Sequence, residues 1–262
     1  MSPRGFSHGR LAAVLAAALL AAAGAVAAPP TPGAPSAKPA PSPTVDEIVG
    51  RYVTARGGIQ KLRALTTLRQ EGRVSAGAGR NGLVMREIKR PGRIRFEFTV
   101  QGVTSVFASD GQHGWKVSPR EGVMGPLPLP NEVLVDAREQ ADIDGPLVDW
   151  KAKGSQVELV GREAVDGHDA YKLKLTLKSG GVLTAFVDVT SASLVRTEAS
   201  RQVRGKQVRI ETTFGDYRKT GGILFPHLVE VRAAGRPQVL RIVVDKVEVN
   251  PPMSDARFAP PT

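Results

Sequence analysis

Cysteine is absent from the 262 residues of the chain. Its absence excludes disulfide bonds, thiolate metal ligands, a cysteine nucleophile and a lipid-modified cysteine anchor. The sequence also has no P-loop and no H-E-x-x-H zinc motif. Histidine is scarce, and the three that follow residue 27, which are His113, His168 and His227, show no spacing typical of metal ligands. The sequence therefore predicts no metal and no cofactor. A zinc site assembled from distant residues is the alternative.

The first 27 residues have the pattern of a signal peptide. Arg4 and Arg10 provide a positively charged start, and residues 11–23 form an Ala/Leu run. Ala25 and Ala27 fit a small-x-small cleavage signal, so we expect cleavage before Ala28 and export to the periplasm. The alternative is that the run stays attached as an N-terminal membrane anchor.

Residues 28–43 are rich in proline, alanine and serine, so they cannot build an apolar core. We expect an extended linker there and a single folded domain over residues 44–262.

The formal net charge is +11, and loss of Arg4 and Arg10 with the signal peptide leaves +9. A basic exported domain could make transient contact with an anionic membrane surface. The dispersed charges fit better with the wet outer face of a long sheet, and export argues against nucleic acid as a partner.

The stretch of residues 90–115 gives the clearest structural signal. Ile94, Phe96 and Phe98 alternate with charged or polar residues, which is typical of a strand with one apolar face. Turn residues at Gln101-Gly102 and Asp110-Gly111 divide this stretch into successive strands, so the pattern predicts an antiparallel meander.

The same pattern continues through most of the chain and predicts about eleven strands with three helical segments. Thr44 and Glu47 form a capping box before the first helix. Residues 59–65 form a second short helix, and residues 131–143 a third that Asn131 would cap. The fold class is therefore mainly β (α+β). Such a long sheet must curl to protect its edges, and so few helices would leave a cavity on its concave face.

Residues 119–130 contain four prolines and are expected to form a loop. The apolar Met124, Leu127 and Leu129 would make this loop either a lid or membrane-touching segment, or a crossover packed on the edge of the domain. Pro226 is expected to interrupt a later strand.

The order of several short motifs resembles the outer-membrane lipoprotein-sorting family, which includes the LolA carrier and the LolB receptor. The resemblance covers roughly residues 44–260. It rests on Gly57-Gly58-Ile59 with Leu62 and Leu65, Asp110-Gly111 with Trp115, Gly145-Pro146-Leu147-Val148-Asp149-Trp150, Phe214-Gly215-Asp216-Tyr217-Arg218, Gly221-Gly222 with Phe225-Pro226, and Val249-Asn250-Pro251-Pro252 with Asp255 and Phe258. It implies an unclosed antiparallel β-barrel whose mouth is plugged by helices and whose cavity takes acyl chains.

We therefore expect an exported, non-enzymatic protein that binds a lipid or a lipoprotein acyl chain and takes part in envelope trafficking. The candidate cavity residues, chosen from the strand faces, are Ile94, Phe96, Phe98, Phe107, Tyr171, Leu173, Leu175, Ile210 and Phe214. One alternative is a periplasmic sensor or protein-interaction module that has a filled core and an envelope protein as its partner. The second alternative is an enzyme on the same fold, although no catalytic residue can be named.

Overall fold

The computed structural model describes residues 42–77, 81–203 and 206–261. The predicted signal peptide and nearly all of the predicted linker lie outside the described residues. Within those ranges, no helix has both the length and the apolar character that crossing a membrane requires.

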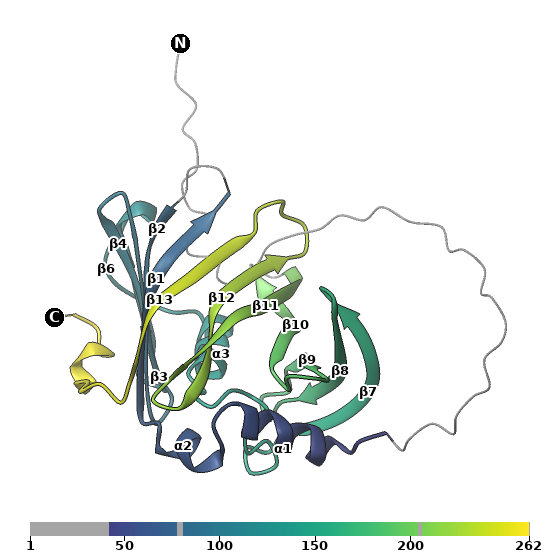
Figure 1. The fold of residues 1–262 in the computed structure, drawn as a ribbon. Helices are drawn as coiled ribbons and strands as arrows, with labels where there is room; N and C mark the ends of the chain where they lie inside the picture. The colour runs from purple at the N-terminus through teal and green to yellow at the C-terminus, as the bar shows by residue number, and fades with distance from the viewer. Residues whose placement is uncertain (1–41, 78–80, 204–205, 262) are drawn as a thin grey trace, which may run out of the picture.

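Thirteen strands of the described chain form one antiparallel sheet that curves but does not close (Figure 1). They are β1 (Thr67–Ala76), β2 (Asn81–Lys89), β3 (Arg93–Val100), β4 (Val103–Ser109), β5 (Gly114–Ser118), β6 (Val123–Pro128), β7 (Gln156–Val165), β8 (His168–Thr176), β9 (Val182–Asp188), β10 (Leu194–Val203), β11 (Lys206–Thr220), β12 (Ile223–Ala233) and β13 (Leu240–Val249). The curved, open and mainly β fold is confirmed, with thirteen strands instead of about eleven.

The strands pair in sequence order except at one junction. β1 pairs with β13, so the first and last strands lie side by side in the middle of the sheet. The two edges are β6 and β7, which come from the middle of the chain. The segment that joins these edges carries α3 (Asn131–Gln140), which lies inside the curve of the sheet (Figure 1). The topology therefore places a helix against the concave face.

The expectation of a loop over residues 119–130 is wrong for most of that segment. It contains the short 3₁₀ helix η2 (Pro119–Glu121) and the strand β6, which pairs only with β5. Proline is tolerated in an edge strand because the missing N–H can face solvent. Met124 and Leu127 are exposed on this strand.

Pro226 does not interrupt β12. It lies opposite Tyr217 of β11, whereas the pairing of β12 with β13 is confined to Leu228–Val231. The N–H that proline lacks is therefore not needed for a ladder with β13 at this position.

The helix α1 (Val45–Ala55) begins with the predicted capping box. The Glu47 amide donates to the Thr44 hydroxyl at 3.2 Å, and the Thr44 amide donates to the Glu47 carboxylate at 2.7 Å. At the other end of the helix, a Cβ on Gly57 would collide with the carbonyl oxygen of Gly222. Glycine at this position lets the end of α1 approach the turn between β11 and β12.

The other two α-helices of the described chain are α2 (Ile59–Ala64) and α3. The helix α3 ends earlier than predicted, and its N-cap is Pro130. Asn131 is therefore the first helical residue, and the prediction that it caps the helix is wrong. The helix packs over β3 and β4.

The main core fills one end of the concave face. Ile48 of α1, Leu62 of α2 and Leu147 of the connector after α3 pack in one cluster with Leu173 and Leu175 of β8. Each of these side chains is at most 1% exposed.

The outer face of β2–β5 is covered by residues 250–261, which include the 3₁₀ helix η3 (Asp255–Arg257). Glu87 is fully buried there between Arg69, at 2.8 Å, and Arg257, at 2.6 Å. The Trp115 indole donates to the carbonyl oxygen of Phe258 at 2.9 Å. Because these contacts cover the outer face of β2–β5, a binding site in this part of the sheet is to be sought on the concave face.

Candidate functional site

A cavity of about 610 Å³ lies between the concave face of the sheet and α3. Its volume falls within the range of roughly 300–1,000 Å³ that is usual for small-molecule sites. Its sheet wall is mainly apolar and includes Leu68, Val84, Phe96, Phe98, Ile210 and Phe214. The side formed by α3 is polar. The cavity therefore has an apolar wall and a charged wall.

The alternation of the strands explains why these residues face the cavity. Ile210, Thr212 and Phe214 of β11 are two residues apart, so their side chains lie on one face of the sheet, and all three line the cavity. Phe96 and Phe98 of β3 follow the same rule, and their rings lie 6.2 Å apart, centre to centre.

The structure brings four of the nine candidate residues together at the cavity wall. They are Phe96, Phe98, Ile210 and Phe214. Their role in binding stays a prediction.

The other five candidates do not border the cavity. Ile94, Tyr171, Leu173 and Leu175 face the same concave side but pack in the core with α1 and α2. Phe107 lies opposite Phe96 in the pairing of β4 with β3, on the part of the sheet over which α3 packs. Periodicity identified the face correctly, but it could not indicate which part of that face the helices fill.

Ion pairs fasten α3 to the far side of the sheet. Arg201 of β10 contacts Asp136 at 3.3 Å and Glu139 at 2.6 Å. The Ser179 hydroxyl donates to the other oxygen of Glu139 at 2.9 Å. Burial raises the pKa of Asp136 even though Arg201 opposes the shift. The helix thus spans the concave face from β3 and β4 to β10.

A second ion pair lies where the chain leaves α3. The Lys153 ammonium contacts the Asp142 carboxylate at 2.7 Å. Burial nevertheless raises the pKa of Asp142, because it outweighs the attraction of Lys153. Both side chains line the cavity.

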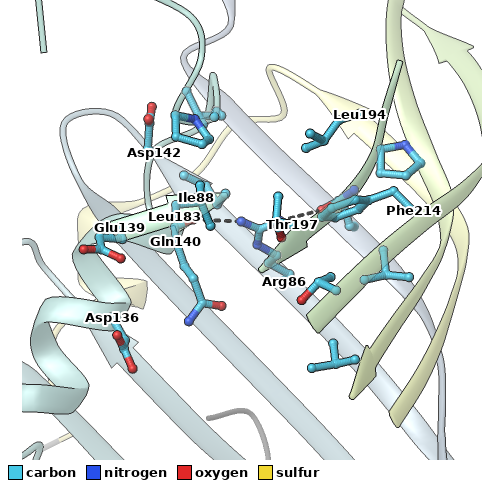
Figure 2. Close-up of a pocket in the computed structure, with 18 of the residues that line it drawn as sticks. Arg86, Ile88, Asp136, Glu139, Gln140, Asp142, Leu183, Leu194, Thr197 and Phe214 are labelled. Carbon is cyan, nitrogen blue, oxygen red and sulfur yellow. Dashed lines mark hydrogen bonds between the residues drawn. The ribbon is translucent and has the colours of Figure 1, made fainter. Parts of the chain in front are cut away.

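Arg86 of β2 lines the cavity, and its hydrogen bonds within the described residues go to neutral acceptors. It donates to Gln70 Oε1 at 3.3 Å and to the carbonyl oxygen of Gln140 at 2.7 Å. Its Nε is buried without a partner among the described residues. Figure 2 shows the side chain between Gln140 on one side and Thr197 and Phe214 on the other. Burial lowers the pKa of Arg86 to about 10, so the guanidinium stays charged at neutral pH.

Another half-buried arginine lines the end of the cavity near α1. Arg56 donates to the Tyr52 hydroxyl at 3.2 Å and to the carbonyl oxygen of Asp144. Tyr217 lies in the same region, where burial raises its pKa and its hydroxyl donates to the carbonyl oxygen of Leu194 at 2.5 Å. Both groups have hydrogen-bond partners among the described residues.

Sequence reasoning missed Arg86, although the sequence carries a signal for it. Arg86 stands midway between Val84 and Ile88 at a spacing of two, which places a charged residue on an apolar strand face. Arg201 and its partners on α3 had no comparable signal, because their contact joins segments more than sixty residues apart.

The histidines and tryptophans do not converge on this cavity. His113 is exposed, the His168 ring contacts Asp188 at 3.0 Å, and His227 bonds to the carbonyl oxygen of Val244 at 2.7 Å. Trp115 packs under the C-terminal segment, and Trp150 packs against the main core.

Two stretches match short catalytic motifs without the structural context that those motifs need. Residues 77–82 read G-x-G-x-x-G, but the flanking strands β1 and β2 pair antiparallel, whereas a dinucleotide loop leads from a strand into a helix. Residues 5–9 read G-x-S-x-G, within the predicted signal peptide and outside the described residues. Neither match supports an active site.

Comparison with known proteins relates the chain to others through its structure. No protein-family model and no curated protein sequence matches it. Among solved structures, a DUF1329 family protein from Desulfovibrio piger aligns with a TM-score of 0.56 at 15% identity over 82% of this chain and 97% of its own.

Two further structures extend this likeness. A LolA superfamily protein from Nitrosomonas europaea aligns with a TM-score of 0.52 at 14% identity, covering 83% of this chain and 98% of its own. A domain assigned to outer membrane lipoprotein sorting, from Vibrio parahaemolyticus, gives 0.54 at 10% identity, covering 81% and 94%. At these identities the likeness concerns the fold alone, and the chain therefore has the fold of LolA-like and lipoprotein-sorting proteins.

Proposed function

We propose that the protein is an exported, non-enzymatic carrier that binds a lipid or a lipoprotein acyl chain in the concave cavity. The observation that carries this proposal is the cavity of about 610 Å³ with its apolar sheet wall. Each methylene group transferred from water to such a wall contributes roughly 0.8 kcal/mol before the entropic costs of binding. A long acyl chain would therefore draw most of its favourable binding free energy from burial of its methylene groups.

The fold shared with LolA-like and lipoprotein-sorting structures supports this assignment, although a fold by itself hosts many functions. The predicted signal peptide supports a periplasmic location and a role in envelope lipid or lipoprotein traffic. The basic charge of the domain is compatible with transient contact with anionic membranes during loading.

The alternative of a sensor or interaction module requires a core filled by the protein's own side chains. The packed cluster near α1 has that character, whereas the region between Phe214 and α3 holds a cavity. The carrier proposal is therefore favoured, and a partner protein would act in delivery or removal of the ligand.

The test is native mass spectrometry of the protein purified from its own envelope, followed by organic extraction. A lipid or acylated peptide present at near-stoichiometric amounts supports the proposal and identifies the class of ligand. Protein that is empty and also takes up no neutral fluorescent probe, such as N-phenyl-1-naphthylamine, contradicts it.

A variant that fills the cavity makes the result specific. Ala199 of β10 lines the cavity, so Ala199→Phe should place a ring in the space a ligand needs. Ala164 of β7 is exposed, so Ala164→Phe adds the same ring elsewhere. We expect Ala199→Phe to lower probe uptake severalfold and Ala164→Phe to leave it unchanged. Equal uptake by both variants would mean that the probe binds outside the cavity.

A further inference from the structure

The charge of Arg86 is not balanced by the residues around it. The side chain is half-buried at the cavity wall, its Nε is enclosed without a partner among the described residues, and its two hydrogen bonds go to the neutral acceptors Gln70 and Gln140. The Phe96 ring lies 5.7 Å away and supplies the negative face of an aromatic ring. A buried cation without a counter-ion is costly, so such a group is retained where it has a partner or a function.

The other arginines that line the cavity differ from Arg86 in their surroundings. Arg138 is exposed and donates to the carbonyl oxygens of Gly111 and Gln112. Arg201 is paired with Asp136 and Glu139. Arg56 has its charge supported by the nearby Asp144 and Tyr52, and its pKa is raised even though burial opposes the shift. Arg86 makes its hydrogen bonds to Gln70 and Gln140 and has no ion pair among the described residues, and burial lowers its pKa.

We propose that Arg86 is the counter-ion for the anionic head of the bound molecule, so that the preferred ligand is an amphiphile with one apolar chain and a carboxylate or phosphate group. This inference rests on the proposed carrier function. The head would lie against the guanidinium, between Gln70 and Gln140, and the chain would lie along Ile210 and Phe214. An arginine fork suits both oxyanions because it donates parallel hydrogen bonds to two oxygens.

The experiment compares ligands that differ only in the head group. Dodecanoate, dodecyl phosphate and dodecanol are titrated against delipidated protein by displacement of N-phenyl-1-naphthylamine, at neutral pH. Because a hydrogen bond to a charged group contributes more than one between neutral groups, we expect the better anion to bind roughly ten- to a hundredfold more tightly than the alcohol. The ratio of the affinities for dodecanoate and dodecyl phosphate identifies whether a carboxylate or a phosphate is the natural head group.

Two variants make the assignment specific to Arg86. In Arg86→Gln the affinity for the anion should fall to about the affinity for dodecanol, while the affinity for dodecanol is retained. Arg73 lies on the outer face, where it pairs with Asp245 at 2.7 Å, so Arg73→Gln removes one positive charge away from the cavity. This control should keep the preference.

Each outcome separates the two proposals. Equal binding of the anions and the alcohol by the wild-type protein overturns the role of Arg86 but leaves the carrier function intact. A preference that survives in Arg86→Gln also overturns it and points to another cation. Failure of every ligand and of the probe contradicts the carrier function itself. Urea unfolding of both variants verifies that they are folded, and removal of an uncompensated buried charge should not lower the stability of Arg86→Gln.

Discussion

The two ends of the concave face have the same strand pattern but different contents. At one end Leu173 and Leu175 are fully buried, whereas at the other end Ile210 and Phe214 border a cavity. The elements that cover them account for the difference. The helices α1 and α2 bring apolar side chains that fill the first end. The helix α3 presents carboxylates and an amide at the second, so a space remains.

The comparison shows that the sheet determines which side chains face inward, and that its cover determines whether they become core or binding wall. A packed end supplies the stability of the fold. An end with a polar cover gives up part of that stability and can instead accommodate another molecule. Mutations at the two ends should therefore separate stability from binding.

The largest expected effect is that of Leu173→Ala at the packed end. Leu173 is fully buried, and its truncation leaves a void that the surrounding helices cannot fill. We expect a loss of about 2–5 kcal/mol in the free energy of unfolding, measured by urea denaturation. Probe affinity of the fraction that stays folded should be close to that of the wild type. A loss below about 1 kcal/mol would mean that this end is loosely packed, and the two ends of the concave face would then not differ as described.

A smaller effect is expected from Arg201→Ala, which breaks the ion pairs that hold α3 over the cavity. The change leaves Asp136 and Glu139 without their cation and should cost about 1–2 kcal/mol. Hydrogen exchange at the amides of α3 should quicken, because the helix loses its attachment to β10.

The control for this variant is Arg209→Ala. Arg209 pairs with Glu198 at 2.6 Å, but its side chain is 63% exposed, so its loss should cost less than about 1 kcal/mol. Exchange in α3 should not change. Equal costs and equal exchange for the two variants would show that α3 is held by its apolar contacts instead.

The next effect in size is that of Phe214→Ala, at the cavity wall. Phe214 is half-buried and borders a space that already exists, so its truncation creates no isolated void. We expect a cost of about 1 kcal/mol, which is the transfer free energy of the part of the ring that is buried. Probe affinity should fall severalfold. Unfolding that is as severe as for Leu173→Ala would place Phe214 in the structural core.

The sequence allowed much of the fold to be predicted, because its main signals are local. Alternation predicted a strand through Ile94, Phe96 and Phe98, which lie in β3, and the capping box located the start of α1. The edge strand β6 was missed because prolines are typical of loops and rare in strands. Whether β6 forms depends on its pairing with β5 and on its place at the edge of the sheet, and the sequence of the segment itself indicates neither.

The site was only partly predictable, for a physical reason. The strand faces gave both Phe214 and Leu173 as cavity residues, and the structure places one at the cavity and the other in the core. The distinction depends on where α1 and α3 cross the sheet, which no pattern within a strand encodes. The charged wall arises from contacts between distant segments, such as Arg201 with Glu139.

The smallest expected effect concerns pH and the polar cover. Burial raises the pKa of Asp142, with the charge of Asp144 adding to the shift and Lys153 opposing it. Below the unfolded-state value of about 3.9 the carboxyl group is neutral in both states. As the pH rises, the unfolded state loses its proton first, so the wild type becomes less stable relative to Asp142→Asn until the pH exceeds the folded-state pKa.

Asp149→Asn is the matched control because the sign of its shift is opposite. The hydrogen bond and charge of Arg63 lower the pKa of Asp149 in the folded state. Its contribution to stability is present above the unfolded-state value and is lost as the pH falls through the folded-state pKa. Urea unfolding between about pH 3 and pH 7 should therefore give slopes of opposite sign for the two wild-type-minus-variant differences. Slopes of the same sign would show that Asp142 is ionised as readily as a surface carboxylate, and that the cover of the cavity is wetter than its burial implies.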